Sequence, residues 1–325
     1  MGRRFLHSIV QPNIDLVASA AITPFDLPVN PLSFLLLRLE VTNVDPTTDL
    51  IYSALDNAID QITAIRILHK GEQIVQGSLR DLMVLNMRAF RAFPGYARLS
   101  SLSAELRSMV FPICLGRKMY DPDSAFPATT RGNLRFEMSA GADGAGHSDI
   151  NFSLSAVELI ESDPTEHVKY TTNSRNAVSG QFDATLPIGN PILGVLLFDT
   201  GLRETEAATY SWGSVKLLKD NVEQYYPTER IEVLAAAMFA NHGYLPYWPG
   251  HFHEKVAAVG AASRTTEAEQ EESSGWNGYA YLDFDPLKDG MYELDTAGAA
   301  DLKIRAEGAD TNAVRWLPVE RVSVR

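Results

Sequence analysis

The sequence predicts an all-β protein made of two tandem β-sandwiches with a few inserted helices. Two observations carry this prediction. Three blocks of sequence recur in the same order in both halves of the 325-residue chain, and most apolar segments are short runs or alternating patterns separated by turn residues. Short strands with turns between them are typical of antiparallel sandwiches. A chain of this length can bury a core in each of two domains of ordinary size.

The first repeated block is a turn that leads into a buried strand. The dipeptide Asn30–Pro31 precedes the apolar run Leu32–Leu39. The dipeptide Asn190–Pro191, 160 positions later, precedes the run Ile192–Phe198. Proline ends the turn in both places and the aliphatic residues follow at once, which is the expected chemistry of a turn followed by a strand.

The second block is a β-hairpin followed by a helix. The segments 64–75 and 214–225 each contain a strand, a tight polar turn and a partner strand, with turns at Lys70–Gly71 and Asp220–Asn221. Apolar residues then recur at helical spacing in both halves. They are Leu79, Leu82, Met83, Met87 and Phe90 in the first half and Ile231, Leu234, Met238 and Phe239 in the second.

The third block closes each half with two strands. The segments 132–142 and 300–309 alternate apolar and polar residues, as strands with one buried face do, and a last strand follows at 150–159 and at 314–324. The polar, turn-rich stretch 162–176 predicts a domain junction. We therefore expect a first sandwich over residues 13–165 and a second over 166–325.

Two further segments interrupt this pattern. Residues 48–62 place Ile51, Leu55 and Ile59 on one stripe of an amphipathic helix, which we expect to cover one end of the first sandwich. The long polar stretch 250–275 predicts an exposed loop in the second half.

Composition excludes several classes of function. The chain has 28 basic and 41 acidic residues, a net charge of −13, and no basic patch that would favour direct nucleic-acid binding. The single cysteine, Cys114, excludes an internal disulfide and a thiolate zinc site, and its apolar surroundings predict an inert buried thiol. No run approaches the roughly 18 apolar residues of a membrane-spanning helix, and the first residues lack the pattern of a signal peptide.

Enzyme and ligand chemistry has only weak support. No phosphate-binding glycine loop, G-x-S-x-G elbow or HExxH helix is present, so we expect a protein with neither enzymatic activity nor a cofactor. The low-ranking metal candidates are His251 and His253, which alternate as strand ligands would, and Asp283 and Asp285, which resemble part of a calcium loop. The histidine pair keeps a bicupin-like metalloenzyme open as an alternative. The aromatic cluster around Trp248 keeps a tandem carbohydrate-binding sandwich open as another.

The most specific stretch of sequence, within residues 25–90, resembles a known family. It contains the strand from Leu27–Pro28 to Leu39, then Leu55, Asn57 and Ile59, Ile65 to Ile67, the Lys70–Gly71 turn, Ile74, Ser78, Asp81–Leu82 and Leu85–Asn86. This order of strand, glycine turn, strand and "DL..LN" helix start is similar to the double jelly-roll major capsid proteins of tailless icosahedral viruses. Among these, the chain is most similar to the proteins of bacteriophages with an internal membrane.

The resemblance implies a fold of two tandem eight-stranded jelly rolls and a structural role in the virion. It implies a homotrimer whose six jelly rolls form a pseudo-hexagonal tile, in contact with neighbouring trimers and with penton and minor capsid proteins. Synthesis would take place in the host cytoplasm. The resemblance also implies an N-terminal arm over residues 1–12. The first ten residues resemble the family's basic amphipathic arm, with Arg3 and Arg4 meeting anionic headgroups of the inner viral membrane and Phe5, Leu6 and Ile9 inserting shallowly.

Overall fold

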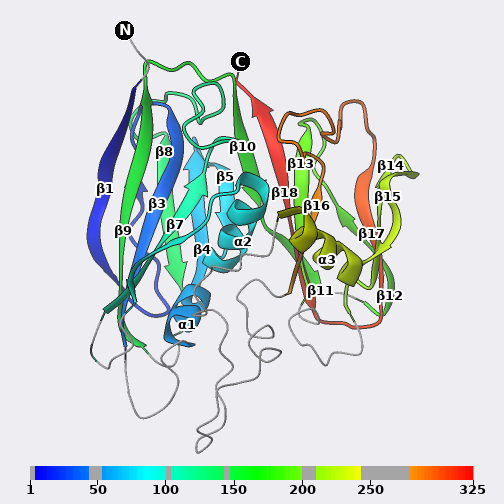
Figure 1. Cartoon of the computed structure of the whole chain (residues 1–325), viewed down its shortest axis with the longest axis horizontal. Helices are drawn as coiled ribbons and strands as arrows, with labels where there is room; N and C mark the ends of the chain where they lie inside the picture. Colours follow the sequence, from blue (N-terminus) through cyan, green and yellow to red (C-terminus); the bar gives the residue numbers. More distant parts are fainter. Residues whose placement is uncertain are drawn as a thin grey trace, which may run out of the picture. The chain divides into compact units, whose positions relative to one another are not determined.

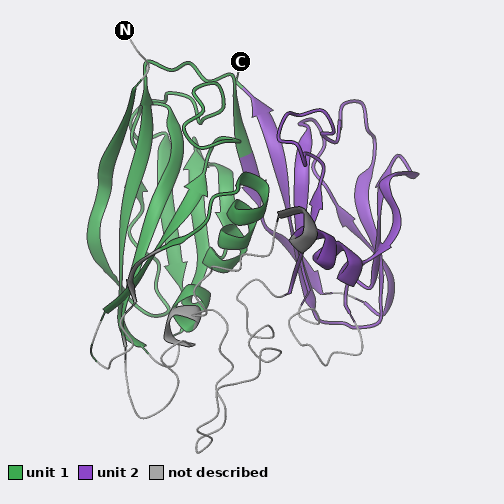
Figure 2. Ribbon diagram, viewed as in Figure 1, with its two compact units in different colours: residues 1–168, 248–275, 324–325 green, residues 169–247, 276–323 purple. Residues whose placement is uncertain are grey.

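The computed structural model describes residues 4–43, 53–99, 104, 106–142, 147–176, 178–199, 210–242 and 278–324. Strands dominate these residues, and three short helices accompany them (Figure 1). The predicted all-β class is confirmed. The described residues form two compact units (Figure 2). Unit 1 contains the chain up to Val168 together with Val324, and unit 2 runs from Lys169 to Ser323.

Unit 1 contains two antiparallel sheets. In the first the strand order is β1 (Arg4–Leu16), β9 (His147–Ile160), β3 (Leu32–Asn43), β7 (Leu106–Cys114) and β6 (Gly95–Leu99). In the second the order is β5 (Glu72–Gly77), β4 (Ile62–His69), β8 (Leu134–Ala140) and β2 (Phe25–Asp26). Side chains that alternate along these strands form the buried core, including Leu35, Leu37, Ile65, Ile67, Phe111, Phe136, Phe152 and Leu154.

Two helices accompany the sheets of unit 1. Helix α1 (Ser53–Gln61) lies within the predicted span 48–62, of which residues 48–52 are outside the described residues, and it ends where β4 begins. Helix α2 (Leu79–Phe90) contacts β4, β5 and β7. Ser78 caps α2 because its hydroxyl accepts a hydrogen bond from the backbone N–H of Asp81 at 3.1 Å. The Ser78 and Asp81 signal in the sequence therefore marks a real helix start.

Unit 2 has the same kind of architecture. One group of strands has the order β16 (Tyr279–Asp283), β13 (Ile192–Phe198) and β18 (Ala313–Ser323), and the short β11 (Asn173–Asn176) also pairs with β18. A four-stranded sheet has the order β12 (Gly180–Thr185), β17 (Leu302–Gly308), β14 (Ser214–Lys219) and β15 (Val222–Arg230). Helix α3 (Ile231–His242) contacts β15 and β16. Between these layers lies a core centred on Trp212, Val195, Leu217, Phe284 and Ile304.

The two predicted hairpins are present as β4–β5 in unit 1 and β14–β15 in unit 2. Their turn residues take left-handed backbone conformations, with φ values of 53° at Lys70, 88° at Gly71, 53° at Asp220 and 63° at Asn221. Two consecutive residues with positive φ define the type I′ turn, whose twist matches that of paired strands. Glycine, aspartate and asparagine are the residues that such turns prefer, so the local sequence was a reliable signal.

The two Asn–Pro turns make the same hydrogen bonds in both units. The side-chain amide of Asn30 donates to Glu158 Oε2 at 2.7 Å, and that of Asn190 donates to Glu320 Oε2 at 2.9 Å. Pro31 O accepts from the N–H of Leu159 at 2.8 Å, and Pro191 O accepts from that of Arg321 at 2.8 Å. Both glutamates are almost fully buried on the last strand of their unit. The two units therefore share these individual hydrogen bonds as well as the sequence pattern.

Two segments differ from the sequence-based expectation. The stretch 162–176, predicted as a polar linker, contains β10 (Glu166–Thr171) and β11. Val168 and Tyr170 of β10 bury their side chains at strand spacing. Residues from Arg4 onward, expected to belong to a separate arm, form β1, which pairs with β9 from the Arg4–Ile160 pair to the Leu16–Ile150 pair.

Candidate functional site

The metal candidates named from the sequence fall into two groups. His251 and His253 lie outside the described residues, as does the aromatic cluster around Trp248. Asp283 and Asp285 lie together at the end of β16. Within the described part of the chain, no three histidine, cysteine, aspartate or glutamate side chains gather as a metal site would require.

The carboxylates of Asp283 and Asp285 close the turn after β16. Asp283 Oδ1 accepts the N–H of Asp285 at 2.9 Å and lies 3.4 Å from the ammonium of Lys288. Asp285 Oδ1 accepts the N–H of Gly290 at 2.9 Å. The hydroxyl of Tyr226 donates to the backbone carbonyl of Asp283, and burial, followed by the charge of the Asp283 carboxylate, raises the pKa of Tyr226 to about 12. These contacts are those of turn-forming aspartates.

Cys114 is buried at the end of β7. Its backbone N–H donates to Asn86 Oδ1 of α2 at 2.8 Å, which ties the helix to the sheet. Burial raises the pKa of the Cys114 thiol well above its ordinary value because a thiolate would lose its hydration there. The reactive form of the side chain is therefore suppressed.

We expect Cys114 to remain unmodified when the native protein is treated with an aromatic disulfide reagent. One thiol per chain should appear only after denaturant is added, because unfolding exposes the sulfur and restores its ordinary pKa. The release of the coloured thiol leaving group measures both states. A Val178→Cys variant is the positive control, since Val178 is 45% exposed and its replacement should react at once. Stoichiometric reaction of native Cys114 within the same time would contradict its burial.

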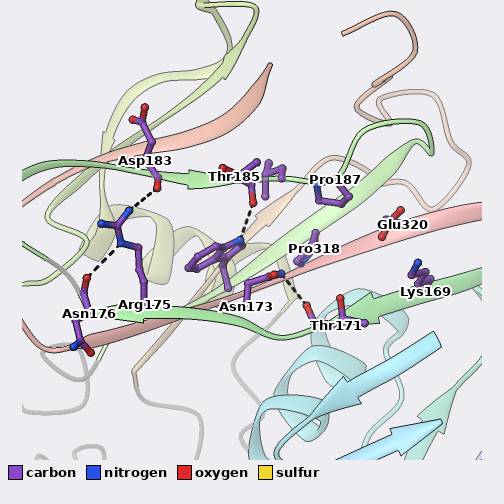
Figure 3. A pocket seen from close by; sticks show the side chains of 12 residues that line it. Lys169, Thr171, Asn173, Arg175, Asn176, Asp183, Thr185, Pro187, Pro318 and Glu320 are labelled. Carbon is purple, nitrogen blue, oxygen red and sulfur yellow. Dashed lines mark hydrogen bonds between the residues drawn. The ribbon is translucent and has the colours of Figure 1, made fainter. Parts of the chain in front are cut away.

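An open groove of about 810 Å³ lies in unit 2 between β11 and β12 (Figure 3). Its polar side chains bond within the unit: Arg175 Nη1 donates to the carbonyl of Asp183 at 2.9 Å, and the indole N–H of Trp316 donates to the carbonyl of Thr185 at 3.1 Å. The Arg175 guanidinium also lies 5.2 Å from the ring centre of Phe182. These bonds connect β11 and β18 to β12, so the groove side chains hold the two layers of unit 2 together.

The carboxylate of Asp183, at the side of this groove, is held by cations on β17. Arg305 donates to its two oxygens at 2.7 and 2.8 Å, and Lys303 lies 3.5 Å away. The hydrogen bonds from Arg305 lower the pKa of the Asp183 carboxyl because they favour its charged form. This pair links the edge strand β12 to its neighbour β17.

An apolar surface surrounds β1 at the edge of the first sheet of unit 1. Phe5 is 59% exposed, Leu6 51% and Ile9 77%, although all three belong to a paired strand. The ring of Tyr120, which is half exposed, lies 5.0 Å from that of Phe5 and 5.1 Å from that of the buried Phe34. We call Phe5, Leu6, Ile9 and Tyr120 the β1 surface.

A second apolar surface surrounds β15 at the edge of the four-stranded sheet of unit 2. Val222 and Tyr225 are more than half exposed on the strand itself. The Tyr225 ring lies 5.3 Å from that of Phe284, which places the loop after β16 beside β15. That loop exposes Leu287 and Met291 by 62% and 69%. We call Val222, Tyr225, Leu287 and Met291 the β15 surface. Sequence analysis missed it, because Val222 and Tyr225 are three positions apart and break the alternation of a strand, while Leu287 and Met291 lie in turns.

The structure places the described residues that were expected to face a membrane on the edge strand β1. The part of the chain that is described holds no helix with the length and apolar character needed to cross a bilayer. Of the residues expected to face a membrane, Arg3 is outside the described residues. Arg4, Phe5, Leu6 and Ile9 lie on β1.

Comparison with known proteins identifies the fold. No protein-family model and no curated protein sequence matches the chain. Solved structures do match over the whole length. The major capsid protein P2 of bacteriophage PM2 aligns with a TM-score of 0.59 and 12% identity, covering 100% of this chain and 98% of that one.

Two further structures give the same result. A chain from the atomic structure of Sulfolobus Turreted Icosahedral Virus aligns with a TM-score of 0.67 and 15% identity, covering 98% of this chain and 91% of that one. A chain of the PBCV-1 virus capsid aligns with a TM-score of 0.60 and 8% identity, covering 98% and 94%. The chain therefore has the double jelly-roll fold of these capsid proteins, as the sequence predicted. The comparisons favour neither the bicupin nor the carbohydrate-binding alternative.

Proposed function

We propose that this chain is a major capsid protein, a non-enzymatic subunit that assembles as a homotrimer and tiles an icosahedral virion shell. The observation that carries the proposal is the full-length likeness to capsid proteins, which covers both units of the chain and nearly all of each matched chain. A likeness confined to one jelly roll would have left many other functions open, because single sandwiches serve unrelated purposes.

The internal repeat supports the trimer. Two units with the same hairpin, helix and Asn–Pro turn give each chain two similar building blocks. Three such chains around a threefold axis would present six similar blocks, which produces nearly sixfold edges suited to a flat lattice. Closed cyclic symmetry also reuses the same contact around the ring and leaves no open end.

Further partners follow from the geometry of a closed shell. Pseudo-hexagonal tiles leave the fivefold vertices unfilled, so we propose separate penton and minor capsid proteins there, and assembly in the host cytoplasm before incorporation into the virion. An internal membrane beneath the shell belongs to the proposal as well. Because residues from Arg4 onward pair with β9, an inserted arm would break those strand hydrogen bonds, and we assign the membrane contact to no particular residue.

Native mass tests the proposed trimer. Light scattering on the purified protein in the presence of a chelator should give about 107 kDa, three times the 35.8 kDa chain. Repeating the measurement over a hundredfold range of protein concentration establishes whether the trimer persists on dilution. The denatured chain provides the mass of the single subunit. A 35.8 kDa particle at every concentration, with no larger assembly in electron micrographs, would contradict the proposed function.

A further inference from the structure

We propose that the β1 surface of one copy of this chain docks on the β15 surface of the next copy, and that this contact, repeated around the ring, closes the trimer. The inference rests on the proposed trimer and names the two faces that form it. It assigns a partner to two edge strands that expose large apolar side chains.

The β1 surface has two features of a protein–protein interface: an unpaired strand edge and exposed apolar side chains. β1 is the end strand of its sheet, thirteen residues long, and its first half exposes three large apolar side chains. Natural proteins rarely leave a long apolar edge strand open, because it invites pairing with another chain. Clustering with Tyr120 extends the apolar area beyond the strand itself.

The β15 surface has the same character in unit 2. β15 ends its sheet, is nine residues long and exposes Val222 and Tyr225. The neighbouring loop adds Leu287 and Met291, and the contact between Tyr225 and Phe284 holds that loop beside the strand. Among the other edge strands described, β2 has two residues, β6 has five, β16 is buried, and β12 is held in polar bonds.

Ring closure requires two different faces. In a twofold dimer one surface meets a copy of itself, whereas a threefold ring is built from head-to-tail contacts between unlike surfaces. The chain has one such surface in each unit. A contact of β1 with β1 would leave the β15 surface exposed and could not close a ring of three.

The charges beside the two surfaces are complementary. β1 carries Arg4 and His7 in its first half and has no acidic residue before Asp15. β15 carries two acidic residues, Glu223 and Glu229, and one basic residue, Arg230, which pairs with Glu232 at 3.1 Å. Glu223 is exposed and lies 3.4 Å from Lys216. Opposite charges at the rim of an apolar contact guide association and fix its orientation, while the apolar centre supplies affinity.

Thiol cross-linking tests the contact directly, because the native Cys114 is buried and should not react with the cross-linker. Ile9→Cys is combined with Val222→Cys or with Thr228→Cys, which sample the two ends of β15, and a flexible bis-maleimide is added. On a denaturing gel we expect covalent dimers and trimers and no larger product, because a closed ring contains three chains. Either single variant alone should remain monomeric in denaturing gels, and Ile9→Cys combined with Val178→Cys is the matched control.

A charge substitution tests the same contact without cross-linking. Ile9→Asp should weaken trimer formation by at least tenfold, because it would bury an unpaired carboxylate in the contact. The circular dichroism of the chain should not change, since Ile9 is 77% exposed. Val178→Asp, also at an exposed apolar position, should leave the trimer intact.

Several outcomes would overturn the inference. A 107 kDa trimer that gives no β1–β15 cross-link would refute the assigned faces and leave the proposed function standing, whereas a stable monomer would refute both. Dimers from Ile9→Cys alone would show that β1 meets β1. A thiol at position 9 that stays reactive in the trimer and is protected only by vesicles of anionic lipid would assign the β1 surface to a membrane.

Discussion

Trp212→Ala is expected to lower the free energy of unfolding of unit 2 by about 3–5 kcal/mol. Trp212 has no exposed surface and lies in the centre of the unit 2 core. Its ring centre is 5.4 Å from that of Phe182 and 6.3 Å from that of Trp316, in an edge-to-face arrangement with the latter. Truncation would remove both aromatic contacts and leave a cavity that the surrounding strands cannot fill.

A hydrogen bond adds to this loss. The indole N–H of Trp212 donates to the carbonyl of Phe198 at 2.9 Å, so its removal leaves a buried carbonyl without that partner. Hydrogen exchange read by mass spectrometry is the suitable measurement, because a chain of two units need not unfold in one step. Peptides from β13, β14 and β17 should exchange faster, and peptides from β3 and β9 should not change.

A graded control separates the two contributions. Trp212→Phe keeps an aromatic ring but loses the N–H donor, and should cost about 1–3 kcal/mol. The two variants are compared at one protein concentration, since assembly itself stabilises the folded chain. Equal protection of β13, β14 and β17 in the wild type and Trp212→Ala would show that Trp212 does not anchor the core.

Local signals were sufficient for the hairpins and the helix start. A type I′ turn needs two residues that tolerate positive φ, and Lys70–Gly71 and Asp220–Asn221 satisfy this within the turn itself. Ser78 caps α2 through a residue only three positions away. Such features depend on neighbouring residues, so sequence alone could place them.

The partners of the Asn–Pro turns could not be predicted in the same way. Asn30 was recognised as half of a repeat, but the Glu158 carboxylate that accepts its amide lies 128 residues later, and Glu320 lies 130 residues after Asn190. No local pattern connects such positions. These contacts depend on the strand register, which brings Glu158 of β9 and Glu320 of β18 beside the Asn–Pro turn of the same unit.

The beginning of the chain shows how tertiary pairing can override a local pattern. The first ten residues resemble a basic amphipathic arm, with Arg3 and Arg4 followed by Phe5 and Leu6, so a separate arm was predicted. In the structure β1 contains two irregularities, between Ile9 and Gln11 and between Gln11 and Ile14, that let it follow β9 despite the imperfect pattern. The apolar side chains that remain exposed are those that we propose as a contact between subunits.

Gly116→Ala is expected to destabilise unit 1 by about 3 kcal/mol, purely through steric overlap. A Cβ atom at Gly116 would lie 1.8 Å from the carbonyl oxygen of Ser124 and 2.7 Å from its carbonyl carbon. These are backbone atoms and cannot rotate away. The two segments are also held together, because the N–H of Arg117 donates to Ser124 Oγ at 2.8 Å. The N–H of Gly116 donates to Ser33 O of β3 at 3.2 Å, which fixes its position further.

Gly95→Ala is the matched control, because a Cβ at Gly95 meets no atom within 4 Å, and its cost should stay within about 0.5 kcal/mol. Thermal unfolding of both variants, with exchange of the β3 and β7 peptides as the local readout, measures the difference. If Gly116→Ala and Gly95→Ala were equally stable, the segments at 116 and 124 could separate at little cost. The close approach of Gly116 and Ser124 in the loop after β7 would then not be needed for the stability of unit 1.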